Sequence, residues 1–451
     1  MKILLWHGYL MSGSGSNVYT LNVASAWRRQ GHDVLVMCQQ KGASGFGPVD
    51  AEGDFLPDNQ SYELAPTGAP AGVGSCTVVR PDIGGLLPVY VYDDYEGFVV
   101  KRFTDLDDAE LDDYVARNVA AMVTALHRFQ PDAVITGHEV MGPYIAKLAC
   151  AQTGHSYIAK LHGSALEYAV KLQERFLRYA TEGLGAATRV VGGSSYMLRE
   201  AASVIPGWED RAVVVNPGVD IELFEPSPGR VPGTTVAFVG KLIAEKGVHN
   251  LIAALGATTT PGLKAVMVGY GGDEVAMAEL ASALRDGDRD RALEVGRTLK
   301  HSDELVAWLE RASEEQMIRY AAIPVEFPGR LEHGPLSEVL PTFDVLVAPS
   351  VVAEAFGMVA AEAAACGVLP LVPHHSGIGE AGLALEERLQ IPGSLRFDPA
   401  APVEGIAAGI DALLSIDPQR RLEMGRAASA LARERWSWDH VAEQLLKAAG
   451  H

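Results

Sequence analysis

The chain has 451 residues, of which 48% are hydrophobic and 21% are charged, and its formal net charge is −20 at pH 7. This length suits two globular domains better than one. The negative charge argues against nucleic acid or an anionic membrane surface as the main partner, because both bind cationic surfaces. A phosphorylated ligand is not excluded, since a few local cations can hold one in an acidic protein.

The cysteines and the first residues indicate a cytoplasmic protein without integral membrane association. The cysteines form no CxxC pair, which favours buried, reduced thiols over a disulfide or metal framework; they are Cys38, Cys76, Cys150 and Cys366. The apolar run 2–6 is short and is followed by SGSGSN, so we expect a first strand rather than a signal peptide. No apolar stretch of transmembrane length is present in the sequence.

The first forty residues predict a βαβ unit. A continuous apolar strand (2–6) precedes a glycine-containing turn at Gly13 and Gly15, a helix over 18–30 and a second apolar strand from Asp33. The glycine turn therefore follows the carboxyl end of the first strand, where open α/β sheets bind ligands.

Strands and helices alternate along the rest of the chain. In the first half we expect strands near 133–136, 156–160, 189–192 and 212–215, and loops around short strands over 41–85. A second series begins near 235 and continues near 264, 325, 344 and 368. The long, charge-rich connection 273–324 is expected to be helical, and its role cannot be read from the sequence.

This order predicts an α/β protein of two doubly wound, Rossmann-like domains facing each other across a cleft. The expected organisation is an N-terminal domain, a Pro/Gly-rich linker, a C-terminal domain and a final helix that crosses the domain junction; the ranges are 1–216, 217–233, 234–434 and 435–451.

The strongest chemical pattern is EAFGMVAAEAAACG, which follows the strand DVLVAPS. Its glutamates, Glu354 and Glu362, are eight residues apart, and a helix is expected to start at Gly357 or Met358. The start of a helix offers unpaired N–H groups and a partial positive charge to a diphosphate. Carboxylates on either side of that start suit the hydroxyls at the two ends of a nucleotide sugar. Two surface glutamates flanking a helix are an equally good interpretation of the spacing alone.

Two further loops follow strands of the second half. GKLIAEKG places Lys241 and Lys246 after the first of these strands, where lysines meet phosphates as point charges. Solvated lysines remain the commoner interpretation of such a loop. GYGG, with Gly269 and Gly271, permits close backbone approach, and a simple tight turn explains it equally well.

Together these segments resemble the retaining GT-B glycosyltransferases of glycosyltransferase family four, also called glycosyl transferases group 1. The resemblance implies that Lys246 and Lys241 bind the donor phosphates, Glu354 the sugar and Glu362 the ribose. It also implies a catalytic role for Lys246 and Glu354. The donor-binding positions carried over from the family are Gly13, Gly15, Gly240, Lys241, Lys246, Gly269, Gly271, Glu354, Phe356, Gly357, Met358, Val359 and Glu362. Lys241 replaces the family's arginine, which keeps the charge and loses the two-pronged hydrogen bonding.

The resemblance also singles out residues of the first half. His162 matches the histidine that the family places against the reacting sugar, although a histidine at a strand end is otherwise more often structural. His138 and Ser164 are candidates for the acceptor side, and His7 has no expected role. No group of residues has convincing metal-ligand spacing, so neither a metal nor another cofactor is expected.

The expected function is transfer of a hexosyl group, with retention, from a nucleoside-diphosphate sugar to a small-molecule or glycan acceptor in carbohydrate metabolism. A UDP-sugar such as UDP-glucose and a soluble acceptor are favoured. The alternatives are a nucleotide-sugar epimerase, a phosphorylase-like GT-B enzyme and a non-catalytic nucleotide-sugar-binding subunit. The sequence identifies neither the acceptor nor the oligomeric state.

Overall fold

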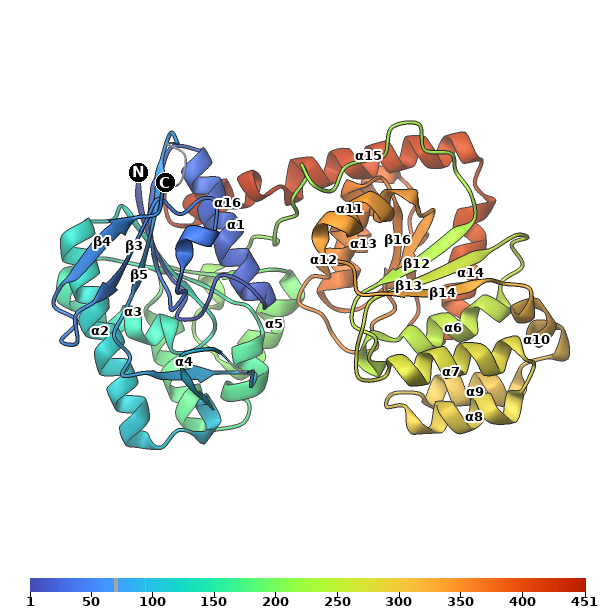
Figure 1. The fold of residues 1–451 in the computed structure, drawn as a ribbon, viewed down its shortest axis with the longest axis horizontal. Helices are drawn as coiled ribbons and strands as arrows, with labels where there is room; N and C mark the ends of the chain where they lie inside the picture. Colours follow the sequence, from blue (N-terminus) through green and yellow to red (C-terminus); the bar gives the residue numbers. More distant parts are fainter. Residues whose placement is uncertain (69–71, 94) are drawn as a thin grey trace. The chain divides into compact units, whose positions relative to one another are not determined.

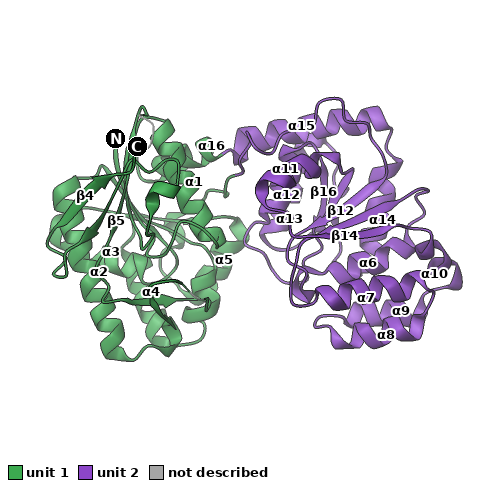
Figure 2. Cartoon of the chain, viewed as in Figure 1, with its two compact units in different colours: residues 1–218, 438–451 green, residues 219–437 purple. Residues whose placement is uncertain are grey.

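The computed structural model describes residues 1–68, 72–93 and 95–451 and divides them into two units. Unit 1 comprises residues 1–218 together with 438–451, and unit 2 comprises residues 219–437 (Figure 2). The segment 217–233, expected to be a linker, belongs to unit 2 from Val219 onward. Phe224 is buried in the core of that unit, and the Arg230 guanidinium donates to the carbonyl of Gly367 (3.1 Å).

The expected helix over 435–451 is two helices, divided at Ser437. Helix α15 (Pro418–Trp436) ends in unit 2, and α16 (Trp438–Ala448) packs against α1 (Gly15–Arg29) in unit 1. The two tryptophans therefore serve different cores: the ring of Trp436 meets Phe356, and that of Trp438 meets Tyr19.

Unit 1 is built on a sheet in which neighbouring strands are parallel except for β3 and β4 (Figure 1). In spatial order the strands are β11 (Ala212–Val214), β10 (Arg189–Gly192), β9 (Ile158–Lys160), β8 (Ala133–Gly137), β1 (Lys2–Trp6), β2 (Asp33–Met37), β5 (Ser75–Arg80), β3 (Ala51–Phe55) and β4 (Tyr62–Pro66). A separate pair joins β6 (Leu86–Val89) to β7 (Val99–Arg102).

Both faces of this sheet are covered, as the uninterrupted apolar strands predict. Alternate residues of β1 enter different clusters, Ile3 on one face and Leu4 on the other. Helices α1 and α16 contribute to the first cluster, and α2, α3 and α4 to the second. The helices of this unit are α1 (Gly15–Arg29), α2 (Asp108–Phe129), α3 (Gly142–Thr153), α4 (Glu174–Ala186), α5 (Ser195–Val204) and α16. Helix α2 starts at a capping box of Asp107 and Glu110.

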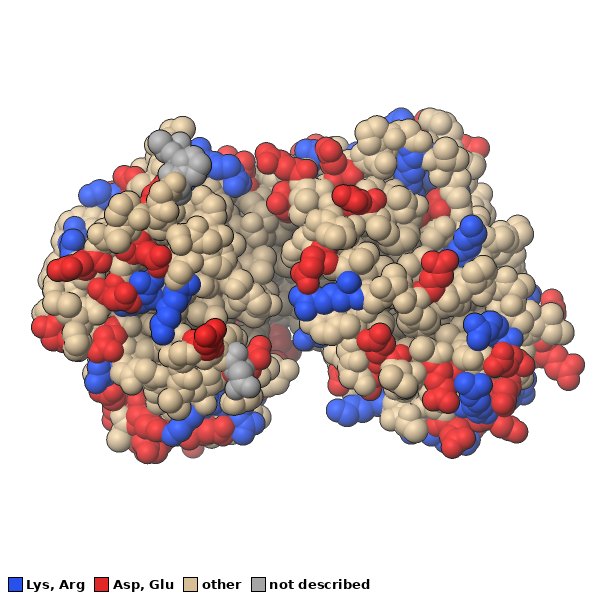
Figure 3. All heavy atoms as spheres, viewed as in Figure 1, with Lys and Arg blue, Asp and Glu red and all other residues tan. Residues whose placement is uncertain are grey.

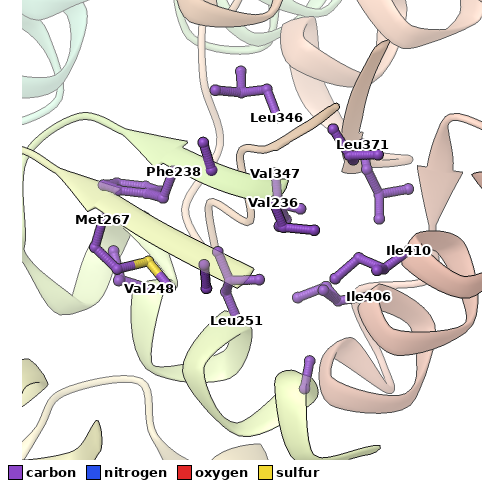
Figure 4. Packing of buried hydrophobic residues seen from close by; sticks show 14 of the residues in the cluster. Val236, Phe238, Val248, Leu251, Met267, Leu346, Val347, Leu371, Ile406 and Ile410 are labelled. Atoms are coloured by element: carbon purple, nitrogen blue, oxygen red, sulfur yellow. The ribbon is translucent and has the colours of Figure 1, made fainter. Parts of the chain in front are cut away.

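Unit 2 has a parallel sheet with its own core. The strands, in spatial order, are β14 (Val325–Gly329), β13 (Lys264–Val268), β12 (Thr235–Val239), β15 (Val345–Val347), β16 (Leu369–Pro373) and β17 (Arg396–Phe397). Figure 4 shows part of this core, in which Val236, Phe238 and Met267 of the sheet belong to the same buried cluster as Leu251 of α6 (Val248–Ala257) and Ile410 of α14 (Pro402–Ser415). These contacts fix the strand ends from which the loops of the site emerge.

The connection 273–324 between β13 and β14 is helical, as expected from its sequence. It folds into α7 (Glu274–Arg285), α8 (Arg289–Thr298), α9 (Asp303–Arg311) and α10 (Glu314–Ala321). The remaining helices of unit 2 are α6 (Val248–Ala257), α11 (His333–Val339), α12 (Met358–Ala365), α13 (Ser376–Leu389), α14 (Pro402–Ser415) and α15.

The distribution of surface charge and the burial of the cysteines agree with what the composition predicts. Acidic and basic side chains alternate over the face of each unit in Figure 3 rather than forming one extended basic patch there. All four cysteines are buried and unpaired. Within the described ranges, no helix combines the length and the apolar character needed to cross a membrane.

Candidate functional site

In unit 2 the strand order reverses between β12 and β15. From β12 the chain proceeds outward to β13 and β14, whereas β15 leads the other way to β16 and β17. Loops that follow two such neighbouring parallel strands diverge and leave a crevice at their carboxyl ends. The residues here are 240–247 after β12 and 348–357 after β15.

Lys246 and Glu354, 108 positions apart in the sequence, form an ion pair at this point. The Lys246 Nζ lies 2.9 Å from the Glu354 Oε1, and the side chains are 33% and 17% exposed. The Ser350 hydroxyl also donates to this carboxylate. Both groups keep solvent access and further hydrogen-bonding capacity, so together they can bind a polar ligand.

The backbone of Glu354 is fixed by the first two residues of α13. Its N–H donates to the Ser376 Oγ (3.1 Å), and its carbonyl accepts from the Gly377 N–H (2.8 Å). A Cβ at Gly377 would lie 2.0 Å from the Ala355 carbonyl oxygen, so glycine is required for this approach. The carboxylate of Glu354 is thus held through main chain and side chain.

Helix α12 begins at Met358, within the expected boundary. Its N-cap, Gly357, has a φ of +84° and supplies no side-chain cap, so the first N–H groups of the helix, at Met358 and Val359, remain available to an anion. The side chain of Phe356 is buried against Trp436 in the core, which leaves the backbone of this expected donor-site residue for a ligand.

Glu362 lies one turn inside α12 and is partly buried. Burial raises the pKa of its carboxyl from 4.5 to about 7, because a low-polarity environment disfavours the charged form. A carboxyl that shifts in this way marks a candidate ligand-binding position.

The other expected phosphate-side residues occupy the loops after β12 and β13. Lys241 is exposed, next to Gly240. A Cβ at Gly269 would lie 1.8 Å from the Gly240 carbonyl oxygen, and one at Gly271 would lie 2.3 Å from that of Leu242. Packing of the two loops against each other therefore explains both glycines, and close approach to a ligand is not needed to account for them.

Unit 1 has its own reversal of strand order, between β1 and β8. Three histidines follow the carboxyl ends of adjacent strands here: His7 after β1, His138 after β8 and His162 after β9. The ring centroid of His138 lies 5.5 Å from that of His7 and 4.9 Å from that of His162. The structure thus brings the two histidines chosen from the sequence together with a third to which no role was given.

Burial keeps these rings uncharged. It lowers the pKa of His7 to about 4 and holds the pKa values of His138 and His162 well below their ordinary value. Lys160, the last residue of β9, is also buried, which lowers its pKa to about 7. Its Nζ donates to the Val215 carbonyl (3.3 Å) and lies 5.2 Å from the centre of the Tyr19 ring.

Glu139 fixes the loop that carries His162. Its Oε1 accepts hydrogen bonds from the N–H groups of His162 (3.0 Å) and Gly163 (2.6 Å). Ser164 follows and is partly exposed. Sequence reasoning missed His7, Glu139 and Lys160, although each stands at the carboxyl end of an expected strand, where open sheets place their functional residues.

The glycine turn after β1 is shorter than expected, because α1 begins at Gly15 rather than near residue 18. Gly13 has a φ of +95°, Ser14 caps the helix by accepting from the Asn17 N–H, and Gly15 is the first helical residue. A Cβ at either glycine would meet no atom within 4 Å, so both positions are open to a ligand or solvent.

Two Rossmann-like units with these strand orders define the GT-B class of fold. Among solved structures, HepE of Anabaena in complex with UDP aligns over all of both chains with a TM-score of 0.63 and 17% identity. Sucrose-phosphate synthase of Thermosynechococcus elongatus aligns over 99% of this chain and 97% of that one, with a TM-score of 0.56 and 18% identity. The expected α/β, GT-B fold class is confirmed.

Residues 14–218 match the glycosyl transferase 4-like domain, and residues 308–430 match the glycosyl transferases group 1 domain. The chain belongs to the group 1 glycosyltransferase family, as the sequence resemblance implied. The second match includes Glu354 and Glu362, whereas Lys246 lies outside it.

The curated relatives are more similar in sequence but align over part of their length. A D-inositol 3-phosphate glycosyltransferase of Segniliparus rotundus is 32% identical over 246 residues, 52% of this chain and 45% of the relative. An alpha-maltose-1-phosphate synthase of Mycolicibacterium smegmatis is 27% identical over 276 residues, 58% and 62% of the two chains. The aligned part of the chain spans roughly half the length of these relatives.

Proposed function

We propose that the protein transfers a hexosyl group from a nucleoside-diphosphate sugar, with retention at the anomeric carbon, to a soluble acceptor in the cytoplasm. The observation that carries this proposal is the Lys246–Glu354 pair at the strand reversal of unit 2, followed by the uncapped start of α12. A cation, a carboxylate and free N–H groups thus lie together at the carboxyl ends of β12 and β15. That combination suits a ligand that carries both hydroxyls and a diphosphate.

Each group has a role in binding the donor. The N–H groups of Met358 and Val359 and the ammonium groups of Lys246 and Lys241 bind the diphosphate. Departure of the sugar builds negative charge on that diphosphate, and these groups stabilise the charge as it develops. Glu354 accepts hydrogen bonds from the hydroxyls of the sugar, and Glu362 from those of the ribose.

The family resemblance supports retention through attack on the face that the diphosphate leaves. The acceptor oxygen forms the new bond to the anomeric carbon as the bond to the phosphate oxygen breaks, and the acceptor proton passes to the departing phosphate. His162 is uncharged, because burial keeps its pKa low, so it orients the donor through hydrogen bonding rather than through an ion pair. A uridine nucleotide is favoured because HepE, which shares the fold, was solved in complex with UDP.

The test begins with a thermal-shift panel of nucleotide sugars on the wild-type protein, followed by transfer from the best donor to a broad pool of acceptors. We expect a UDP-sugar to stabilise the protein most. The anomeric proton coupling of the product should show the configuration of the donor. An inverted product, or isomerised donor in the absence of acceptor, would overturn the proposal.

Lys246→Ala provides the residue-level test. Loss of this cation should lower the transfer rate by about a hundredfold or more, in the range seen when one transition-state hydrogen-bond donor is removed. The matched control is Lys264→Ala, which removes an exposed lysine at the opposite end of the neighbouring strand β13. Equal activity of the two folded variants would remove Lys246 from the site.

A further inference from the structure

Buried polar atoms without partners gather at the strand reversal of unit 1. They are Nδ1 of His7, both ring nitrogens of His138 and Oε2 of Glu139, none of which has a hydrogen-bond partner among the described residues. All three side chains are at most 1% exposed. Buried polar atoms are nearly always hydrogen-bonded in proteins, so a concentration of unpaired ones indicates a bound polar partner.

The tautomer of His7 indicates which hydrogen-bonding groups that partner must have. Its Nε2 lies 2.8 Å from the Asn17 Oδ1, and the Asn17 amide nitrogen donates to the Ser12 carbonyl (2.5 Å). The amide orientation therefore makes Nε2 the protonated nitrogen and leaves Nδ1 as an acceptor. His138 adds one donor and one acceptor in its neutral form. Hydroxyl groups complement this set, because each one both donates and accepts.

The charge around these atoms opposes an anionic partner. The loops that follow β1, β8, β9, β10 and β11 contain no lysine or arginine; they are 7–14, 138–141, 161–164, 193–195 and 215–218. The loop after β2 contains Lys41, whose Nζ donates to the Gly97 carbonyl (3.4 Å). Lys160, directly before the loop 161–164, is 3% exposed and donates to a backbone carbonyl. Glu139 contributes a carboxyl instead. A phosphate or carboxylate would therefore lack the cationic partner that such groups require.

The backbone of the same loop is strained, and its border is accessible. His138 and Met141 have φ values of +72° and +64°, which non-glycine residues seldom adopt, and such strain concentrates at functional sites. Tyr9 and His162 contact the His138 ring and are partly exposed. A ligand can thus reach the border of the cluster, with the unpaired atoms beneath it.

We propose that His7, His138 and Glu139 form a subsite of unit 1 that binds an uncharged, hydroxyl-rich acceptor in preference to a phosphorylated one. The assignment rests on the proposed function, because it takes the ligand to be the acceptor of the transfer. It also separates this chain from its D-inositol 3-phosphate glycosyltransferase relatives, whose name specifies a phosphorylated molecule.

Binding is tested without the donor, by NMR of protein carrying ¹³C-labelled histidine. The His138 ring signal is identified by its loss in His138→Phe. Titration with myo-inositol, glucose, maltose or glycerol should shift this signal in at least one case, with a Kd of about 100 mM or below. Inositol 3-phosphate, glucose 6-phosphate and inorganic phosphate should bind at least tenfold more weakly. A stronger response to the phosphorylated compounds, or no response to any neutral one, would overturn the proposal.

Transfer assays with the best donor compare each neutral acceptor with its phosphorylated counterpart: myo-inositol with inositol 3-phosphate, and glucose with glucose 6-phosphate. The neutral member of each reactive pair should have the higher kcat/KM, by tenfold or more. His138→Phe keeps an aromatic ring and removes its nitrogens, so it should raise the acceptor KM at least tenfold without lowering the melting temperature. The control, His155→Phe, changes a partly buried histidine before the amino end of β9 and should leave the acceptor KM unchanged. Equal KM values in the two variants would contradict the assignment.

The two proposals fail in different ways. If no nucleotide sugar stabilises the protein, the proposed function fails, whatever the histidine signals show. If a UDP-sugar binds and is transferred but phosphorylated acceptors are preferred, only the acceptor class is wrong.

Discussion

Glu362→Gln should stabilise unit 2 at high pH and much less at low pH. The carboxyl has a pKa of about 7 in the folded protein and an ordinary value of 4.5, the shift being caused by burial. Below pH 4.5 the group is protonated in both the folded and the unfolded chain, so burial carries no charge penalty. Between pH 4.5 and 7 the folded state retains a proton that the unfolded chain has lost, and stability falls as pH rises. Above pH 7 the penalty is complete.

The magnitude follows from that shift. Ionising a carboxyl whose pKa has risen from 4.5 to about 7 costs up to about 3 kcal/mol, and partial solvent exposure reduces this to about 1–2 kcal/mol. For a unit of this size, that free energy corresponds to an increase of about 2–8 °C in melting temperature at pH 8. At pH 5 the glutamine should add no more than about 1–2 °C, because most of the penalty is absent there.

Scanning calorimetry of wild type and variant at pH 5 and pH 8 measures this difference. Any cost of burying the glutamine amide is the same at both values and cancels in the comparison. Glu387→Gln, which changes an exposed glutamate on α13, is the matched control and should leave both melting temperatures nearly unchanged. A Glu362→Gln shift that is equal at the two pH values, or larger at pH 5, would refute the assigned burial effect.

Three further predictions concern the donor site. Because Lys246 and Lys241 supply positive charge at the phosphate end of the site, turnover should persist in excess EDTA; activity that vanishes and returns with magnesium or manganese would contradict this. Gly269→Ala should destabilise unit 2 by about 2–4 kcal/mol, since the added Cβ would lie 1.8 Å from the Gly240 carbonyl oxygen. Gly334→Ala in α11, where a Cβ meets nothing within 4 Å, should stabilise by about 0.5–1 kcal/mol, and calorimetry compares the two. Wild type should use a 2′,3′-dideoxyribose donor about tenfold or more less efficiently than the ribose donor. Glu362→Gln should reduce this ratio of efficiencies, and Glu354→Gln should preserve it. Identical ratios in the two variants would show that the glutamates do not bind separate ends of the donor.

Much of the fold could be predicted because it is encoded locally. Apolar strands separated by amphipathic segments indicated doubly wound units, and the sequence before Met358 marked the start of α12. Strand β5 was not singled out, because it lies in a Gly- and Pro-rich stretch, although it pairs along its length with β2. The break at Ser437 was also missed, since the amphipathic pattern continues through both tryptophans while the chain passes between cores.

The site was predictable only as separate pieces. Lys246 and Glu354 were each chosen from their loops, but their ion pair depends on β12 lying beside β15. In the same way, the meeting of His7 with His138 depends on β1 lying beside β8. The burial of the Phe356 side chain could not be predicted, because a motif position does not reveal whether a side chain points toward a ligand or toward Trp436. Strand order and side-chain direction are long-range properties that spacing along the chain does not specify.

The return of the chain to unit 1 at Trp438 has a consequence for its synthesis. Trp27 donates its indole N–H to the carbonyl of Ala442 (3.0 Å), and Trp438, Val441 and Leu445 are buried in the same cluster as Ile3. During translation, residues 1–218 leave the ribosome with this apolar surface uncovered. It stays uncovered while all of unit 2 is made, because α16 is translated afterwards. Unit 2 is a continuous segment and can fold as it emerges. Unit 1, although its first residues are made earliest, can be completed only after α16 has been translated.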